Sequence, residues 1–355
     1  MADETLTHFS SGNLKDLSAA KAVWSKRLFD TARAEAAQGR VNAARALRAA
    51  VNPEPEQNVV GIGVGEKISN GQHTGVMAVK FLVRLKYPEG QMADQHVLPK
   101  TIDGLPVDVE EVGTFRAFAA APHIASPAPK VPNPRTKMRP GHPGCSVGFQ
   151  DPGNQFVMAG TFGALVKDKE GKTYILSNNH VLADEGQLRP GAPIFQPGLL
   201  DHGNAATDKI AKLTKFVPLH ASSPNKVDCA IAELLDPKLA NHDILFIGKP
   251  NAPARAEIDM TVQKFGRTTS YTVGRISSID TDVKVGYETG TFTFNGQIIV
   301  VGLNGSSFSA AGDSGSLIVQ RPGRHAVGLL FAGSSTHTIA NHIADVLSEL
   351  NVTLA

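Results

Sequence analysis

The pattern of apolar and polar positions first predicts a helical arm. Residues 14–51 contain no proline and one glycine, and Ala, Arg, Lys, Glu and Leu dominate, which favours helix. Two apolar stripes, before and after Gly39, predict two helices or one kinked helix. The first stripe is Leu14, Leu17, Val23, Trp24 and Leu28, and the second is Val41, Ala44, Leu47 and Val51. We interpret residues 1–52 as an arm with a packing or oligomerisation face; a basic arm for an acidic partner is the alternative.

A second pattern begins where Pro53 and Pro55 end the helix. Residues 59–64, 75–85 and 105–112 are rich in Val, Ile and Phe and are typical of strands, which predicts a small α/β module over residues 53–119. The glycines at 61, 63 and 65 do not have the spacing of a phosphate-binding loop. They are better explained as strand positions that another backbone approaches closely.

A third pattern follows a proline-rich stretch. Residues 120–144 carry seven prolines with Lys and Arg between them, which predicts an extended linker and a domain boundary. Beyond the linker, ten short β-rich runs alternate with turn signals and indicate β-barrels or a sandwich over residues 145–355. These runs are 160–167, 172–177, 209–216, 228–235, 261–265, 271–280, 290–294, 297–301, 315–319 and 326–331, and a helix near residues 343–350 closes the chain.

Composition narrows the class of protein. A chain of 355 residues with 41% hydrophobic residues is long enough for two or three domains and is not disordered. Its 35 basic and 33 acidic residues leave a net charge of +2, so nucleic acid is not an expected partner. Cys145 and Cys229 fit neither a disulfide framework nor a zinc site. The sequence shows no secretory signal and no membrane span, so we expect a cytoplasmic protein.

Candidate chemistry lies in the β-rich half of the chain. Ser314 stands between small residues in Gly-Asp-Ser-Gly-Ser, where backbone amides can face a developing oxyanion. His180 follows an apolar strand, and Asp228 begins another. A serine hydroxyl needs an adjacent base, and an imidazole base needs an acceptor that holds its tautomer. The three residues come from separate β elements, as a cleft between two barrels requires.

These motifs closely resemble those of the chymotrypsin/trypsin-like serine peptidases, in the same order. Asn-His at 179–180 matches the end of the catalytic-histidine strand, Asp-Cys-Ala-Ile-Ala at 228–232 the aspartate strand, and Gly-Asp-Ser-Gly at 312–315 the nucleophile loop. Closer still, Leu-Ser-Asn-Asn-His-Val-Leu at 176–182 and Lys-Phe-Gly-Arg-Thr-Thr at 264–269 look like bacterial relatives of the plant narrow-leaf proteases. The resemblance implies a mainly β, two-barrel peptidase domain preceded by the arm and the small module.

The resemblance also implies roles for individual residues. Ser314 would attack a peptide carbonyl, with the amides of Gly312 and Ser314 as the oxyanion hole. Residues 327–333, which include Phe331 and Gly333, resemble the strand along which substrate backbone pairs. Phe308 falls at the floor of the primary pocket and Gly333 at its wall. A floor without a carboxylate predicts cleavage after small or medium apolar residues rather than after Lys or Arg.

Alternatives exist for several of these residues. Asp208 is a rival for the triad acid, and Asp184 a weaker one. His337 and His342 are spaced so that they do not share a helical face, so no metal site and no cofactor are expected. The family's amino-terminal partner for the aspartate before the serine is missing here, which leaves Asp313 to pair with another group such as Arg267 or to be solvated.

The sequence therefore predicts a serine endopeptidase that acts on protein or peptide substrates through an acyl-enzyme. His180 would be the base and Asp228 would orient it. The alternative is a catalytically silent scaffold that binds peptides or assembles with partner proteins. The apolar stripe of the arm further predicts a homo-oligomer that is lost when residues 1–51 are deleted.

Overall fold

The computed structural model describes residues 11–37, 55–88, 96–117, 132–151, 153 and 157–355. Six antiparallel strands form a closed ring in the order β12-β15-β16-β17-β14-β13, because β12 also pairs with β13. The strands are β12 (Thr261–Gly266), β13 (Ser270–Gly286), β14 (Thr291–Gly302), β15 (Leu317–Gln320), β16 (Ala326–Gly333) and β17 (His337–His342). Apolar side chains from these strands, together with Phe308, fill the interior of this barrel. We call it the second barrel.

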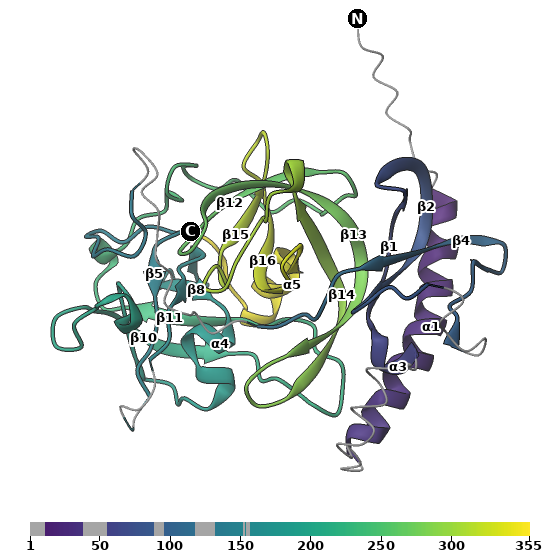
Figure 1. The fold of residues 1–355 in the computed structure, drawn as a ribbon. Coiled ribbons are helices and arrows are strands. Elements are labelled where there is room, and N and C mark those ends of the chain that lie inside the picture. The colour runs from purple at the N-terminus through teal and green to yellow at the C-terminus, as the bar shows by residue number, and fades with distance from the viewer. Residues whose placement is uncertain (1–10, 38–54, 89–95, 118–131, 152, 154–156) are drawn as a thin grey trace, which may run out of the picture.

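A separate six-stranded sheet lies beside the second barrel, in the order β18-β7-β8-β11-β10-β9 (Figure 1). Its strands are β7 (Ala164–Lys167), β8 (Thr173–Ser177), β9 (Pro193–Phe195), β10 (Lys209–Phe216), β11 (Ala230–Leu234) and β18 (Thr353–Leu354). A short pair, β5 (Ser146–Val147) and β6 (Gly160–Thr161), accompanies it. We call this unit the first barrel. The mainly β architecture confirms the fold class predicted from the sequence.

Two predicted strands prove to be one. Residues 290–294 and 297–301 belong to the single strand β14, and β13 extends well beyond the predicted end at residue 280. Gly296 has a φ of +67°, and the β13–β14 register shifts in this region, so the interruption in the pattern marks a bend rather than a strand end. The closing helix is α5 (Ile343–Leu350), and its apolar residues Ile343, Val346, Leu347 and Leu350 are buried.

The small module is continuous with the second barrel. Strand β1 (Val59–Ser69) pairs with β13 on one side and with β2 (Gln72–Val83) on the other, and β4 (Leu105–Glu111) and β3 (Thr101–Ile102) complete a ten-stranded sheet. A side chain at Gly63 would clash with Thr281, and one at Gly65 would clash with the Ser277 carbonyl. Close backbone approach therefore explains Gly65, as predicted, whereas the side chains of Thr281 and Ser278 leave no room at Gly63. The boundaries placed at residues 52, 119 and 144 stay predictions.

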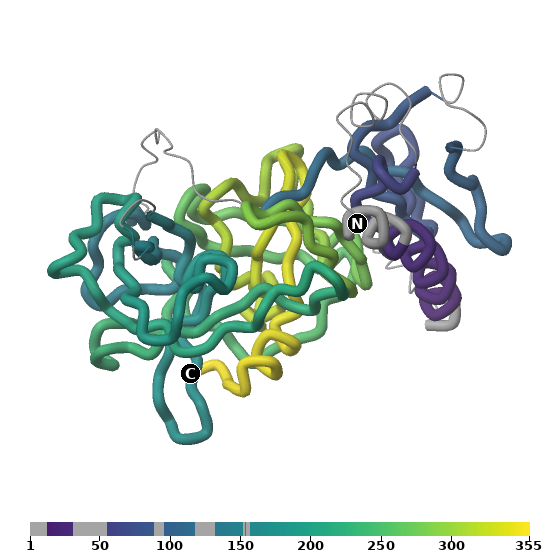
Figure 2. Tube along the Cα trace, turned by 90° about the horizontal axis from the view of Figure 1, so that it is seen from below, coloured from purple at the N-terminus to yellow at the C-terminus, as the bar shows by residue number. Residues whose placement is uncertain are grey.

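The described part of the arm forms one helix, α1 (Ser11–Ala37), against the sheet of the small module (Figures 1 and 2). Leu17, Leu28 and Phe29 are buried there together with residues of β1 and β2. Val23 is 69% exposed, so it does not belong to the packing face. The second stripe, after Gly39, lies outside the described residues. Because the chain itself covers the first stripe, the stripe no longer gives a reason for self-association, and the homo-oligomer stays a prediction.

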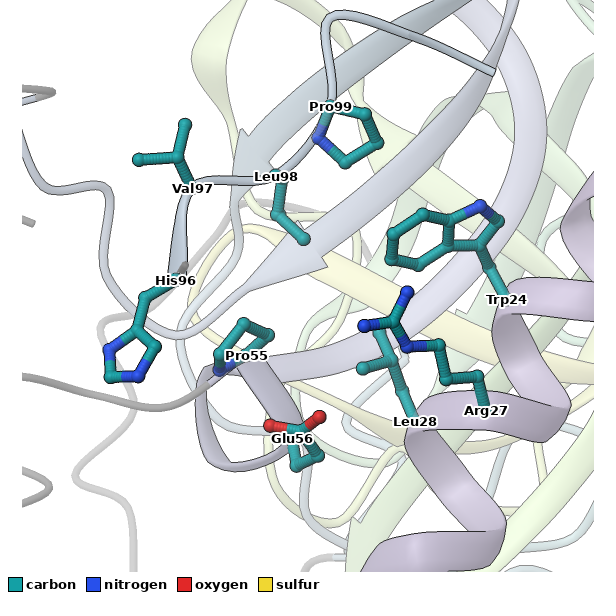
Figure 3. A pocket seen from close by; sticks show the side chains of 9 residues that line it. All are labelled: Trp24, Arg27, Leu28, Pro55, Glu56, His96, Val97, Leu98 and Pro99. Carbon is teal, nitrogen blue, oxygen red and sulfur yellow. The ribbon is translucent and has the colours of Figure 1, made fainter. Parts of the chain in front are cut away.

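The arm also touches the barrel and borders a cavity. Lys21 donates to Asp282 of β13 at 2.8 Å, and Ser25 donates to the same carboxylate at 2.5 Å. A cavity of about 500 Å³ lies between α1, the short helix α3 (Pro55–Asn58) and residues 96–99 (Figure 3). Its lining residues all belong to the arm and the small module. Among the described residues, no helix has both the length and the apolar character needed to cross a membrane.

A partly buried carboxylate, that of Glu110, links the module to the barrel. Glu110 of β4 forms an ion pair with Lys80, whose Nζ lies 2.7 Å from Oε2, and Glu110 Oε1 lies 3.1 Å from His337 Nε2 of β17. Burial opposes ionisation, but the hydrogen bond from His337 and the charge of Lys80 outweigh it and hold the pKa of Glu110 at about 2, against an ordinary value of 4.5. This depressed pKa stabilises the fold above pH 4.5, and the contribution disappears as the pH falls from 4.5 toward 2.

We therefore expect Glu110→Gln to lower the free energy of unfolding by about 3 kcal/mol at pH 6, and this deficit should shrink as the pH falls through that window. Urea unfolding at a series of pH values measures it. Glu111→Gln, in the exposed neighbouring position, is the matched control. A deficit that stays constant between pH 6 and pH 2.5 would show that the Glu110 contacts do not depress its pKa.

Candidate active site

His180 lies in the single-turn helix α4 (Asn179–Leu182), directly after β8. Ile175 and Leu176 of the strand and Val181 and Leu182 of the turn are buried in one apolar core, which anchors the backbone on both sides of His180. His180 Nδ1 lies 2.5 Å from Asp228 Oδ2, and the two side chains are 2% and 0% exposed. The sequence-predicted base and acid are thus in direct contact.

Asp228 precedes β11 and is surrounded by donors. Its Oδ1 accepts from the backbone N–H of Asn179 at 2.7 Å and of His180 at 3.4 Å. Its Oδ2 accepts from the hydroxyl of Tyr287 at 2.8 Å as well as facing His180 Nδ1. A carboxylate removed from water is tolerated when donors satisfy its oxygens. The arrangement holds the imidazole proton on Nδ1 and leaves Nε2 as the acceptor.

Two asparagines position the backbone of Asp228. Asn178 Nδ2 donates to the Asp228 carbonyl at 2.8 Å, and Asn341 of β17 accepts from the Asp228 N–H at 3.0 Å. Asn341 in turn donates to Gln297 of β14 at 2.7 Å. The acid on the first barrel is therefore held by side chains from both barrels.

Tyr287 contacts the predicted triad, and the sequence analysis missed it. It directly follows β13, is partly buried, and meets the His180 ring edge-on at a centroid distance of 5.9 Å. Burial and the negative charge of Asp228 raise the pKa of Tyr287 well above its ordinary value, so its hydroxyl remains a donor. No local motif marks this residue, because its position depends on the length of β13.

Ser314 lies in the turn before β15, next to the element that carries His180. Gly312 and Gly315 both have a φ of +93°, which favours glycine on either side of the turn. A Cβ at Gly160 would lie 2.6 Å from Val181 and 3.0 Å from the Ser314 carbonyl oxygen. Gly160 therefore allows the nucleophile turn to approach α4.

The serine and the histidine are close neighbours but do not share a hydrogen bond in this structure. Ser314, which is 3% exposed, donates from Oγ to the Phe331 carbonyl at 3.4 Å. His180 Nε2 is buried and has no hydrogen-bond partner among the described residues. Contacts between a serine and its histidine are often loose before substrate binds.

Backbone amides at the turn are available for an oxyanion. In the described part of the chain, the N–H groups of Gly312 and Ser314 donate to no acceptor, whereas Gly315 N–H donates to Leu330. Thr161 fixes the orientation of the turn, because its hydroxyl donates to the Gly312 carbonyl at 2.9 Å and its N–H to the Ser314 carbonyl at 2.8 Å. The predicted oxyanion-hole amides are thus free donors.

Asp313 is fully buried and paired with Lys264, whose Nζ lies 3.4 Å from Oδ2. Its carboxylate also accepts from Thr268 N–H at 2.8 Å, from the Thr269 hydroxyl at 2.6 Å and from Ala310 N–H at 3.0 Å. Burial lowers the pKa of Lys264, and the charge of Asp313 offsets part of that shift. These contacts anchor the turn that carries Ser314.

The expected partner for Asp313 was wrong. Arg267 instead binds Asp201 through two contacts, Nε to Oδ2 at 2.5 Å and Nη2 to Oδ1 at 2.6 Å. Solvation is also excluded, because the Asp313 side chain is 0% exposed. Lys264 and Arg267 lie in the same sequence motif. Only the fold of β12 shows that Lys264, and not Arg267, faces the turn that carries Asp313.

The rival acids lie elsewhere. Asp208 pairs with Lys137, and Asp184 follows α4 with a carboxyl whose pKa is raised by burial and by the nearby charge of Glu185. Burial also raises the pKa of the Cys145 thiol to about 12, so it is not a nucleophile at neutral pH. Within the described residues, no cluster of His, Cys, Asp and Glu has the composition of a metal site.

The predicted substrate-binding residues lie on or beneath the second barrel. Phe308 is buried in the barrel interior with Lys264 Nζ 5.7 Å from its ring centroid. Phe331 packs against Phe294 at a centroid distance of 4.7 Å, and Gly333 ends β16. Their roles in substrate binding stay predictions.

Comparison with solved structures finds several proteases that match part of this chain. No family model and no curated protein matches the sequence. A protease described as glutamic acid specific, with a histidine triad in substrate binding, is 17% identical; the match covers 60% of this chain and 100% of that one, with a TM-score of 0.42. Nocardiopsis protease (15% identity, 60% and 97% coverage, TM-score 0.43) and Thermobifida fusca protease A (16%, 60% and 97%, 0.42) are also similar.

The two-barrel topology is the fold that the resemblance to the chymotrypsin/trypsin-like serine peptidases implied. None of the comparisons tests the closer resemblance to relatives of the narrow-leaf proteases, which stays a prediction.

Tyr287→Phe should lower kcat about tenfold with little change in KM, because it removes a hydrogen bond to the buried carboxylate that orients His180. Tyr271→Phe is the matched control, since the Tyr271 hydroxyl donates to Gln263, away from the triad. Steady-state kinetics on a peptide ester measure both variants. Equal kcat values for the two folded variants would show that Tyr287 does not position the triad.

Proposed function

We propose that this chain is a serine endopeptidase in which Ser314 is the nucleophile, His180 the base and Asp228 the residue that orients it. The observation that carries the proposal is the buried 2.5 Å contact between His180 Nδ1 and Asp228, with Ser314 on the adjoining turn. The unpartnered His180 Nε2 and the free amides of Gly312 and Ser314 support it.

The reaction would begin when Ser314 Oγ rotates away from Phe331 toward His180 Nε2. Oγ attacks the peptide carbonyl while Nε2 takes its proton, and the amides of Gly312 and Ser314 donate to the oxyanion. The tetrahedral intermediate collapses, and the leaving amine takes the proton from His180. Water then attacks the acyl-enzyme by the same route and releases the acid, which restores Ser314.

The turn that carries the nucleophile is supported from within the chain. In the resembled family a new amino terminus pairs with the aspartate before the serine, whereas here Lys264 supplies the cation. We therefore expect a formed oxyanion hole without proteolytic activation. Protein or peptide substrates and a cytoplasmic location are parts of the same proposal.

A catalytically silent peptide-binding scaffold is the second candidate. It is favoured by one observation: Ser314 Oγ bonds to Phe331 rather than to His180, and both catalytic side chains are nearly inaccessible. Such a scaffold would bind peptides along β16 without forming an acyl-enzyme, so activity measurements separate the two functions.

Ser314→Ala and His180→Ala are expected to abolish hydrolysis of casein, a fall of at least about 10³-fold, because each removes a reacting group. Ser314→Ala should unfold at a temperature close to that of the wild type, whereas His180→Ala should unfold at a lower temperature because it removes a donor to the buried Asp228 carboxylate. Ser222→Ala, which changes an exposed serine, is the control. Casein hydrolysis by a purified Ser314→Ala protein at the wild-type rate would contradict the proposed mechanism.

Primary specificity follows from the floor assigned to Phe308. An aromatic floor without a carboxylate favours small or medium apolar residues before the cleaved bond. Profiling a peptide library by mass spectrometry should find such residues there, and Phe308→Ala should widen the preference toward larger side chains. Cleavage mainly after Lys or Arg would refute the assignment.

A further inference from the structure

The segment that follows β4 runs along the end of β16. Arg116 N–H donates to the Gly333 carbonyl at 3.0 Å, and Gly333 N–H donates back to the Arg116 carbonyl at 3.1 Å, as in an antiparallel strand pair. On its other side, Gly286 N–H donates to Phe115 at 3.0 Å, and Ala117 N–H donates to Gly286 at 3.0 Å. The segment is therefore a strand held between the ends of β16 and β13.

This strand has the direction that a bound substrate needs. Gly333 lies two residues after Phe331, whose carbonyl oxygen is 3.4 Å from Ser314 Oγ. Because the pairing is antiparallel, residues 115–117 point in the direction that leads along β16 from Gly333 toward Phe331. This is the direction toward Ser314 along the backbone groups that the proposed function assigns to substrate.

A buried aromatic ring anchors the segment. Phe115 is fully buried in an apolar cluster that includes Phe331 and Ala332 of β16 and Phe294 of β14. The Arg116 side chain is exposed, so the residues alternate between a buried and an open side as in any strand. At the other end, Gly113 has a φ of +73°, where the chain leaves β4 and turns toward the barrel.

Resting on the proposed peptidase function, we propose that residues 114–117 are a built-in occupant of the peptide-binding strand. The slot between Gly333 and Gly286 takes an extended peptide backbone with a large apolar side chain in the place of Phe115. An extended peptide substrate must displace this segment, whereas a small reagent that reacts only with Ser314 need not. The segment therefore restrains hydrolysis of long substrates in cis.

Arg116→Pro tests the restraint, because proline lacks the N–H that bonds to Gly333. For a peptide with at least four residues before the cleaved bond, kcat/KM should rise about threefold to tenfold, mainly through a lower KM. Labelling of Ser314 by a small fluorophosphonate should keep its rate. Arg116→Ala is the matched control: it keeps the amide, so its kcat/KM should stay closer to that of the wild type. An unchanged or lower kcat/KM in a normally labelled Arg116→Pro protein would overturn the inference.

Hydrogen exchange on the wild-type chain gives a second test that needs no substitution. Ser314 is modified either with the small fluorophosphonate or with a trialanyl phosphonate, which adds its own backbone along β16. Exchange at the Arg116 and Ala117 amides should be at least about tenfold faster in the trialanyl adduct. Equal protection in the two adducts overturns the inference alone, whereas failure of both reagents to modify Ser314 contradicts the proposed function itself.

Discussion

The arrangement of the site depends on one carboxylate, that of Asp228, which has no access to water. An isolated buried charge costs several kcal/mol, so the fold must supply donors to it. Those donors are the backbone of α4, the ring of His180 and the hydroxyl of Tyr287. Tyr287 belongs to the second barrel and α4 to the first. The need to satisfy one charge therefore fixes how the two barrels meet.

The same junction connects the amino-terminal module to the triad. Gly286 holds the segment that follows β4, and the next residue, Tyr287, holds Asp228. The module is attached to the barrel through β1 and β13 and through the contacts of Glu110 and His337. A change at Gly286, which binds residues 115 and 117, therefore lies one residue from Tyr287, which donates to Asp228. Through these neighbouring contacts the module can influence the site although it holds no second catalytic centre.

The sequence predicted those parts of the site that have local signatures. His180, Asp228 and Ser314 each stand at the end or start of an apolar run, so their strands and motifs could be identified without the fold. Tyr287 and Lys264 could not, because their roles depend on which way β12 and the long strand β13 run. The pairing of β1 with β13 was missed for the same reason, although the glycines of β1 had indicated that another backbone lies close.

The central claim is that the buried His180–Asp228 pair makes Ser314 a nucleophile, and burst kinetics with p-nitrophenyl acetate test it most directly. The account predicts a rapid release of about one equivalent of p-nitrophenol per chain, with the acetyl group mapped to Ser314 by mass spectrometry. The burst should disappear in Asp228→Asn, in which the imidazole takes the wrong tautomer. Absence of a burst in the wild type, or an acetyl group on any other residue, would contradict the account.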